Sequence, residues 1–131
     1  MKYLLDTNTL IAIFNHPSSS AHRRLRSQSP SDIAISSIVA YELYYGAFKS
    51  ARQGENAGRI DALQFQILPF DREDARHAGD VRAALERAGT PIGSYDILIA
   101  GQARSRNLIL ATNNGREFAR VDGLQIEDWH R

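Results

Sequence analysis

Short apolar runs alternate with longer segments of helical spacing along this chain. The runs are KYLL at 2–5, IAI at 33–35, IL at 67–68 and LILAT at 108–112. Between them, hydrophobic residues recur at helical intervals, as in the segment from Asp71, which can cap a helix, to Gly89, which ends it. Because strands that alternate with helices pair side by side, the sequence predicts an α/β sandwich with a mainly parallel sheet.

Local signals predict where further helices begin. Ser36 or Ser37 can cap the segment IVAYELYYGAFKSA, and Ser94 can cap a later helix. Residues that loosen a helix then follow, namely Gly54, Asn56 and Gly58. We therefore expect the next helix only at 59–66.

Length and composition are those of one folded domain spanning residues 1–131. The absence of cysteine removes disulfides, thiolate nucleophiles and Cys-based zinc sites, and it fits a reducing compartment. Asp6 and Asn8 interrupt the apolar N-terminus, and no uncharged run approaches the roughly 20 residues that cross a bilayer. We expect a cytoplasmic protein without membrane association. The net charge of +1 does not by itself indicate a nucleic-acid binder.

Three acids fall at the ends of predicted strands or in the helices that follow. Asp6 follows the first run, Glu42 follows the second, and Asp96 comes shortly before the last. Polar residues also follow the run at 108–112, namely Asn113, Asn114 and Glu117. Ligands of open parallel sheets bind beyond the carboxyl ends of the strands. We therefore expect four segments to bring oxygen atoms to one edge of the sheet.

Each acid has a structural explanation beside the functional one. Asp6 is a preferred helix cap, and taken alone that explanation is as good as any other. Glu42 and Asp96 stand among apolar residues, where an unpaired carboxylate is costly. Acids that converge from such segments repel one another and raise their own pKa values, and a divalent cation removes that conflict.

An all-oxygen set of ligands favours Mg²⁺ or Mn²⁺ over Zn²⁺. Such ions usually keep waters and are completed by phosphate oxygens. The chemistry that this implies is metal-assisted hydrolysis of a phosphoester.

The remaining motifs are less informative. Two basic clusters are either solvated helix faces or contacts to a nucleic-acid backbone. They comprise Arg23, Arg24 and Arg26, and Arg104 and Arg106. An aromatic series at helical spacing favours core or interface over base stacking, and it comprises Tyr41, Tyr44, Tyr45 and Phe48. His77 and His130 are expected on the surface.

Three stretches carry a family resemblance that extends in order over almost the whole chain. They are LLDTN at 4–8, SSIVAYELYYGAFKS at 36–50 and PIGSYDILIAGQARSRNLILATNNGREFARVDGLQIEDW at 91–129. Together they resemble the VapC toxins, which are PIN-domain ribonucleases of bacterial toxin–antitoxin pairs, and in particular the branch found on enteric virulence plasmids. The resemblance implies a three-layer α/β/α sandwich. It also implies a toxic Mg²⁺-dependent endoribonuclease that cuts initiator tRNA in the anticodon loop and inhibits translation.

The resemblance implies that Asp6, Glu42 and Asp96 form the acidic metal site, with Asp6 and Asp96 as direct ligands. Thr7 and Asn8 would orient Asp6 or a bound water.

At a fourth position this chain departs from the family. Many PIN domains carry a further Asp there, whereas this chain has Asn114. Asn114 and Glu117 are therefore secondary candidates for the site. The expected partners are RNA, a VapB-type antitoxin whose C-terminal segment wraps the toxin, and a second copy of the chain, which the Tyr-rich helix from Ile38 could contact. A higher toxin–antitoxin assembly is also expected.

Two alternatives stay open at this point. An enzyme that forms an aspartyl-phosphate at Asp6 would usually carry a second Asp two residues on, and here that position is Asn8. A PIN-like module that binds RNA or a partner without catalysis is the other alternative, and the departure at Asn114 keeps it open.

Overall fold

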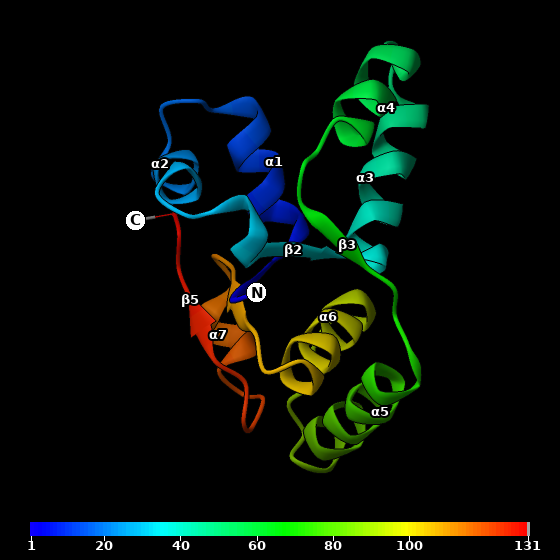
Figure 1. Ribbon diagram of the computed structural model, residues 1–131. Helices are drawn as coiled ribbons and strands as arrows, with labels where there is room; N and C mark the ends of the chain where they lie inside the picture. Colours follow the sequence, from blue (N-terminus) through cyan, green and yellow to red (C-terminus); the bar gives the residue numbers. More distant parts are fainter. Residues whose placement is uncertain (131) are drawn as a thin grey trace.

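A five-stranded parallel sheet lies at the centre of the computed structural model, which describes residues 1–130 (Figure 1). In chain order the strands are β1 (Tyr3–Leu5), β2 (Ile33–Ser36), β3 (Gln66–Leu68), β4 (Ile109–Ala111) and β5 (Ile126–Glu127). They lie side by side as β3-β2-β1-β4-β5, and each neighbouring pair is parallel. The prediction of a mainly parallel sheet is confirmed. The order reverses between β1 and β4, which are neighbours although a hundred residues separate them.

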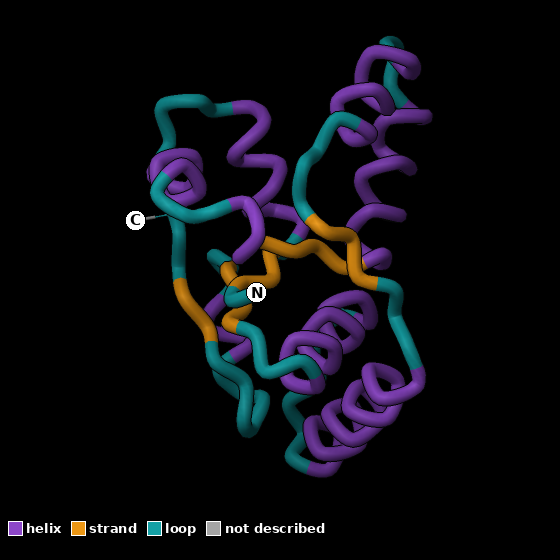
Figure 2. Tube along the Cα trace, viewed as in Figure 1, coloured by secondary structure: helices purple, strands orange, loops and turns teal. Residues whose placement is uncertain are grey.

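Helices cover both faces of the sheet, so the molecule has three layers. They are α1 (Thr7–Asn15), α2 (Ser20–Arg26), α3 (Ser37–Lys49), α4 (Gln53–Asp61), α5 (Arg72–Arg87), α6 (Ser94–Ser105) and α7 (Gly115–Phe118), with a 3₁₀ turn η1 (Pro30–Asp32). Figures 1 and 2 show α1 to α4 on one face, and α5 and α6 on the other. This division follows from the right-handedness of strand-helix-strand connections, because the chain reverses direction across the sheet after β3. Within the described part of the chain, no helix is long and apolar enough to cross a membrane.

The central strand is buried on both faces. Tyr3, Leu4 and Leu5 are 3%, 0% and 0% exposed, as expected for a parallel strand with helices above and below it. At the start of the strand, the ring of Tyr3 meets the fully buried Trp129 edge to face, with 5.1 Å between ring centroids. Asp6, which directly follows this strand, is also buried.

Most of the predicted helix ends are confirmed. The Ser36 hydroxyl accepts from the Ile38 N–H at 3.0 Å and caps α3. Asp71 caps α5 in a reciprocal capping box, and Gly89 follows the helix with a φ of 72°. The cap of α6 is Gly93, whereas Ser94 is the first helical residue.

The prediction of a helix at 59–66 is wrong at both ends. The helix α4 begins at Gln53 and includes Gly54 and Gly58. Its buried Ile60 and half-buried Ala57 pack into the core. Tertiary packing thus outweighs the weak helix propensity of glycine. Gln66 lies in β3, where it pairs with Ala34.

The helix α6, which carries Asp96, is locked against α5. A Cβ added at Gly101 would lie 2.6 Å from the Ala78 Cα, so the two backbones touch. Beside this contact, the fully buried Asp74 accepts from Arg106 at 3.0 Å and from the Gln102 amide at 3.1 Å. The close approach and the buried polar network together fix the position of α6.

Replacing Gly101 by Ala should destabilise the protein by roughly 1–3 kcal/mol, because the new methyl group collides with the backbone of α5. Urea unfolding measures the change. Gly79→Ala is the matched control on α5, since its Cβ would meet nothing within 4 Å, and it should be neutral or slightly stabilising. Equal stability of the two variants would contradict the close approach.

Candidate active site

Asp6 lies at the carboxyl end of β1, where the order of the strands reverses. Its Oδ2 accepts a 2.5 Å hydrogen bond from the Thr112 hydroxyl, which directly follows β4. Its Oδ1 accepts from the Thr9 N–H at 2.9 Å, so Asp6 also caps α1. The side chain is only 5% exposed. The helix cap and the position at the strand ends are therefore two roles of one carboxylate.

Two buried threonines that sequence reasoning did not select hold this carboxylate. Thr112 donates to Asp6 and accepts from the backbone N–H of Asn114 at 2.9 Å. Thr9 donates its hydroxyl to the Ala111 carbonyl at 3.2 Å. Both were visible as hydroxyl residues beside an apolar run, in LLDTNT and LILAT. The groups to which their hydroxyls donate, the Asp6 carboxylate and the Ala111 carbonyl, lie more than a hundred residues away in sequence.

Glu42 is half-buried on α3 and is oriented by Thr7. The Thr7 hydroxyl donates to the Glu42 Oε1 at 2.9 Å. Thr7 was expected to orient Asp6 or a water, but in the structure its partner is Glu42. Asn8 is exposed.

Asn114 and Glu117 lie together after β4. The Asn114 side-chain amide donates to the Glu117 Oε2 at 3.0 Å. Asn114 thus stands where many PIN domains have an acid, and it holds the neighbouring carboxylate in place.

The other acids of the site raise the pKa of Asp96. Burial and, in decreasing order, the charges of Asp6, Glu117 and Glu42 together raise its pKa to about 6. The first turn of α6 would by itself favour an anion, so burial and the other carboxylates outweigh the helix end. The expected convergence of acids from four segments is therefore present in the fold.

The residues fit an open site for a hard divalent ion. Among residues 1–130, no group of three or more His, Cys, Asp or Glu side chains is close enough to hold a metal ion by itself. Mg²⁺ does not need such a group, because it keeps several waters and binds through one or two carboxylates together with substrate phosphates. The oxygens at this edge, charged and mutually repelling, are of that kind.

Two of the predicted RNA-binding arginines lie far from these acids. Arg104 and Arg106 lie at and just beyond the other end of α6, about 12 and about 15 Å along the helix axis from Asp96 at roughly 1.5 Å per residue. Arg104 pairs with Asp80 at 2.7 Å and donates to the His77 ring at 2.9 Å. Arg106 belongs to the buried network around Asp74. Both guanidinium groups thus hold α5 and α6 together, which argues against a role in binding RNA.

The other basic cluster lies on α2. Arg24 forms an ion pair with Glu127 and stacks over the Trp129 ring. Arg23 donates to the Ser18 carbonyl at 2.7 Å, and Arg26 is exposed.

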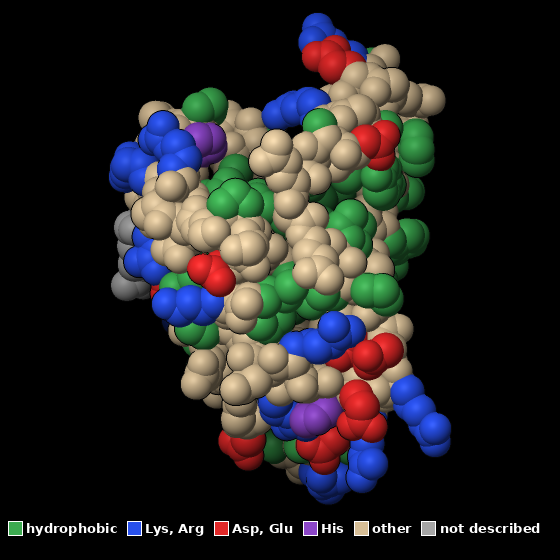
Figure 3. All heavy atoms as spheres, viewed as in Figure 1, with side chains coloured by type: hydrophobic (Ala, Val, Ile, Leu, Met, Phe, Trp, Pro, Cys, Tyr) green, Lys and Arg blue, Asp and Glu red, His purple; other side chains and the backbone are tan. Residues whose placement is uncertain are grey.

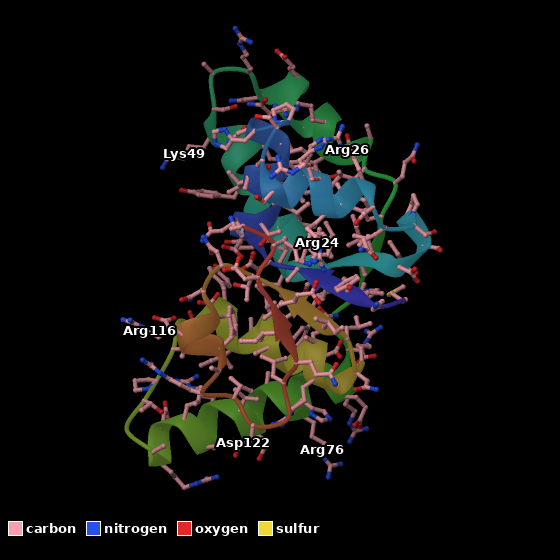
Figure 4. The ribbon with its side chains drawn as sticks, turned by 90° about the vertical axis from the view of Figure 1, so that its left-hand side faces the viewer. Arg24, Arg26, Lys49, Arg76, Arg116 and Asp122 are labelled. Atoms are coloured by element: carbon pink, nitrogen blue, oxygen red, sulfur yellow. The ribbon has the colours of Figure 1, made fainter. Side chains whose placement is uncertain are left out.

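Figure 4 shows two further cations, Lys49 and Arg116, which project from the same side of the molecule. Arg116 stands on α7, immediately before Glu117 in sequence. Arg116 is therefore better placed for a substrate at the acids than Arg104 and Arg106.

The two histidines expected on the surface are both half-buried. His77 accepts from Arg104, and the His130 Nε2 lies 3.1 Å from the Thr9 hydroxyl. His130 thus contacts Thr9, whose backbone N–H donates to the Asp6 cap of α1, although the two residues are far apart in sequence.

Comparison with known proteins covers both the sequence and the fold. The model of the PIN domain family matches residues 3–124. The tRNA(fMet)-specific endonuclease VapC of Salmonella typhimurium is 45% identical over 98% of both chains. The protein of the same name from Shigella flexneri is also 45% identical, again over 98% of both chains. The crystal structure of DNA-bound VapBC from Salmonella typhimurium matches with a TM-score of 0.91 and 43% identity, covering 98% of each chain.

These similarities confirm the expected three-layer PIN fold and extend over the strands, the acids and the helices that carry them. Nucleases of this type generally depend on a divalent metal. The chain belongs to the PIN domain family, within its VapC group.

Proposed function

We propose that this chain is the toxin of a toxin–antitoxin pair, a Mg²⁺-dependent endoribonuclease that hydrolyses RNA phosphodiester bonds. The observation that carries the proposal is the convergence of acids on Asp96, whose pKa is raised to about 6 by burial and then by the charges of Asp6, Glu117 and Glu42. A module that only binds RNA or a partner would gain nothing from acids held together against their repulsion. A bound cation turns the same repulsion into affinity for a phosphate.

Each residue of the site has a defined task in this proposal. Asp6 and Asp96 would hold the ion, which when bound would neutralise charge on the phosphate and polarise the attacking water. Thr112 and Thr9 keep the Asp6 carboxylate in one orientation. Glu42, positioned by Thr7, accepts the proton of the attacking water.

The reaction is an in-line displacement at phosphorus. A water oxygen forms a bond to the phosphorus while the bond to the 3′ oxygen breaks. The 3′ oxygen takes a proton from solvent, and the products are a 5′-phosphate and a 3′-hydroxyl. No 2′-hydroxyl nucleophile takes part.

The names of the relatives support a more specific substrate. Both VapC proteins described above are called tRNA(fMet)-specific endonucleases. We therefore propose initiator tRNA, cut in its anticodon loop, as the substrate. Inhibition of translation would follow in the cytoplasm, and Mn²⁺ would replace Mg²⁺ as an alternative ion.

A groove between α1, α3 and α4 supports the proposed antitoxin partner. It encloses about 300 Å³ and is lined by apolar groups such as Phe14, Leu43 and Ile60. Glu42 also lines the groove, so a peptide that lies in it would reach the acids and could place a basic side chain beside them. The solved structure from Salmonella typhimurium is a VapBC complex. We propose a VapB-type antitoxin segment in this groove, together with a homodimer of the toxin and a larger assembly.

The raised pKa of Asp96 predicts how stability depends on pH. The folded protein binds this proton more tightly than the unfolded chain, so the metal-free wild type gains stability as pH falls through about 6 and loses it as pH rises. Asp96→Asn removes the unfavourable charge. Its melting temperature in EDTA should therefore exceed that of the wild type by a few degrees above about pH 7, with the gap closing towards pH 4.

Thermal unfolding at several pH values measures this difference. Asp122→Asn is the control. It removes an exposed carboxylate and keeps the backbone carbonyl that accepts from Arg104. Its melting temperature should match that of the wild type at every pH. A constant difference between Asp96→Asn and wild type across the pH range would contradict the convergence of charges.

Cleavage of RNA tests the proposed function directly. Wild-type protein incubated with total tRNA and Mg²⁺ should produce new 5′ ends that EDTA abolishes. Asp96→Asn should reduce the rate more than a hundredfold, and Thr112→Val by about 10–100-fold, because loss of a partner that orients a ligand costs this much. Asp122→Asn should cleave normally. Full activity of folded Asp96→Asn would refute the assigned site.

Filling the groove tests the antitoxin proposal. Gly46 lines the groove, and a Cβ added there would meet nothing within 4 Å. Gly46→Phe should leave RNA cleavage intact but weaken neutralisation by the antitoxin, measured as cell growth during co-expression. Gly58→Phe is the matched control, since it has the same free space but does not line the groove. Equal neutralisation of both variants would place the antitoxin elsewhere.

A further inference from the structure

Two exposed tyrosines stand directly beside the acids. Tyr41 precedes Glu42 on α3, and Tyr95 precedes Asp96 on α6. Their rings are 55% and 44% exposed. The ring centroids are 5.9 Å apart, and the Tyr95 hydroxyl donates to the Tyr41 hydroxyl at 3.4 Å. One continuous aromatic surface thus joins the two helices at the mouth of the site.

Electrostatics place this pair within reach of the acidic site. The hydrogen bond to Tyr41, the charge of Tyr41, burial and then the charge of Glu42 all raise the pKa of Tyr95. A neutral aromatic surface beside acids does not repel RNA.

Core packing does not explain these two rings. Tyr44, on the same helix, is half-buried, donates to Asp61 and stacks on Phe48, so it has a structural role. Figure 3 shows hydrophobic side chains along the exposed edge of α3. A cluster of exposed aromatic groups marks a binding surface more often than exposed aromatic residues that are scattered singly.

We propose that Tyr41 and Tyr95 form a stacking platform for a base next to the cleaved phosphodiester. This inference rests on the proposed function. Single-stranded RNA is commonly bound by stacking its unpaired bases on aromatic side chains, and such stacking tolerates any base because every base has a π face. The platform would hold the nucleotide, and so position its phosphate over Asp96 and Glu42.

RNA fits this surface better than a second copy of the chain. Tyr45 lies one helical turn beyond Tyr41, and the Lys49 ammonium is 5.7 Å from the centroid of the Tyr45 ring. Arg116 stands on the same side of the molecule as Lys49 (Figure 4). Cations interleaved with aromatic rings are typical of grooves that bind single strands. A second copy seated over Tyr41 and Tyr95 would cover the acids and exclude the substrate. For Tyr41, this proposal replaces the expectation that the aromatic series of α3 is core or interface.

Binding of a labelled single-stranded RNA containing an anticodon-loop sequence tests the platform. The full chain is used with Ca²⁺ in place of Mg²⁺, and fluorescence anisotropy gives the affinity. Tyr41→Ala and Tyr95→Ala should each bind about tenfold more weakly. Tyr41→Phe and Tyr95→Phe keep the ring and should bind like the wild type. An RNA with abasic nucleotides beside the cleaved bond should be bound equally by wild type and the Ala variants.

Phe48→Ala is the matched control, because Phe48 is 57% exposed on the same helix, two turns from Tyr41. It should keep wild-type affinity. Unchanged RNA binding by Tyr41→Ala and Tyr95→Ala would overturn the platform. Light scattering that shows a dimer for the wild type and monomers for these variants would also overturn it. If the wild type cleaves tRNA with Mg²⁺ in these cases, only the platform fails. If the wild type neither cleaves nor binds RNA, the proposed function fails as well.

Discussion

The hydrogen bond from Thr112 to Asp6 ties together the two strands between which the sheet reverses its order. Because β1 and β4 are parallel neighbours with helices leaving in different directions, their carboxyl ends leave an opening that no main-chain connection closes. Asp6 occupies this opening, caps α1 and accepts from β4 at the same time. The other acids are arranged around this fixed carboxylate, so the whole site depends on one buried contact.

Repulsion between the acids is the cost of this arrangement. A protein whose ligands are carboxylates cannot relax them apart if the elements that carry them are rigid. The helix α6 is held by the contact of Gly101 with Ala78 and by the buried Asp74 network, both distant from the site. Arg104 and Arg106 belong to the contacts that hold α6, and with it Asp96, against α5. Either a divalent ion or a basic side chain from a partner can relieve the strain, which links catalysis and neutralisation to one pocket.

Sequence alone predicts four of the five strands, because short apolar runs are local signals, and it misses the two-residue β5. It also selects Asp6, Glu42 and Asp96, because charged residues among apolar neighbours stand out, and their role stays a prediction. It does not reveal which side chains meet. Thr112 is an ordinary residue until the register of β1 and β4 brings it to Asp6, and the same register brings the Ala111 carbonyl to the Thr9 hydroxyl. Thr7 was assigned to the nearest acid in sequence, whereas its partner lies on another helix. The early start of α4 was missed for the same reason, since packing of Ile60 outweighs two glycines.

The central claim is that four carboxylates act on one another across the sheet edge. Carbon NMR of the side-chain carboxyl groups, recorded against pH in metal-free protein, measures this most directly. The Asp96 carboxyl should titrate with a pKa of about 6, should titrate at lower pH in an Asp6→Asn variant, and should lose its proton at still lower pH when Mg²⁺ is added to the wild type. An Asp96 that titrates like an ordinary exposed aspartate, unaffected by Asp6 or by the ion, would contradict the account.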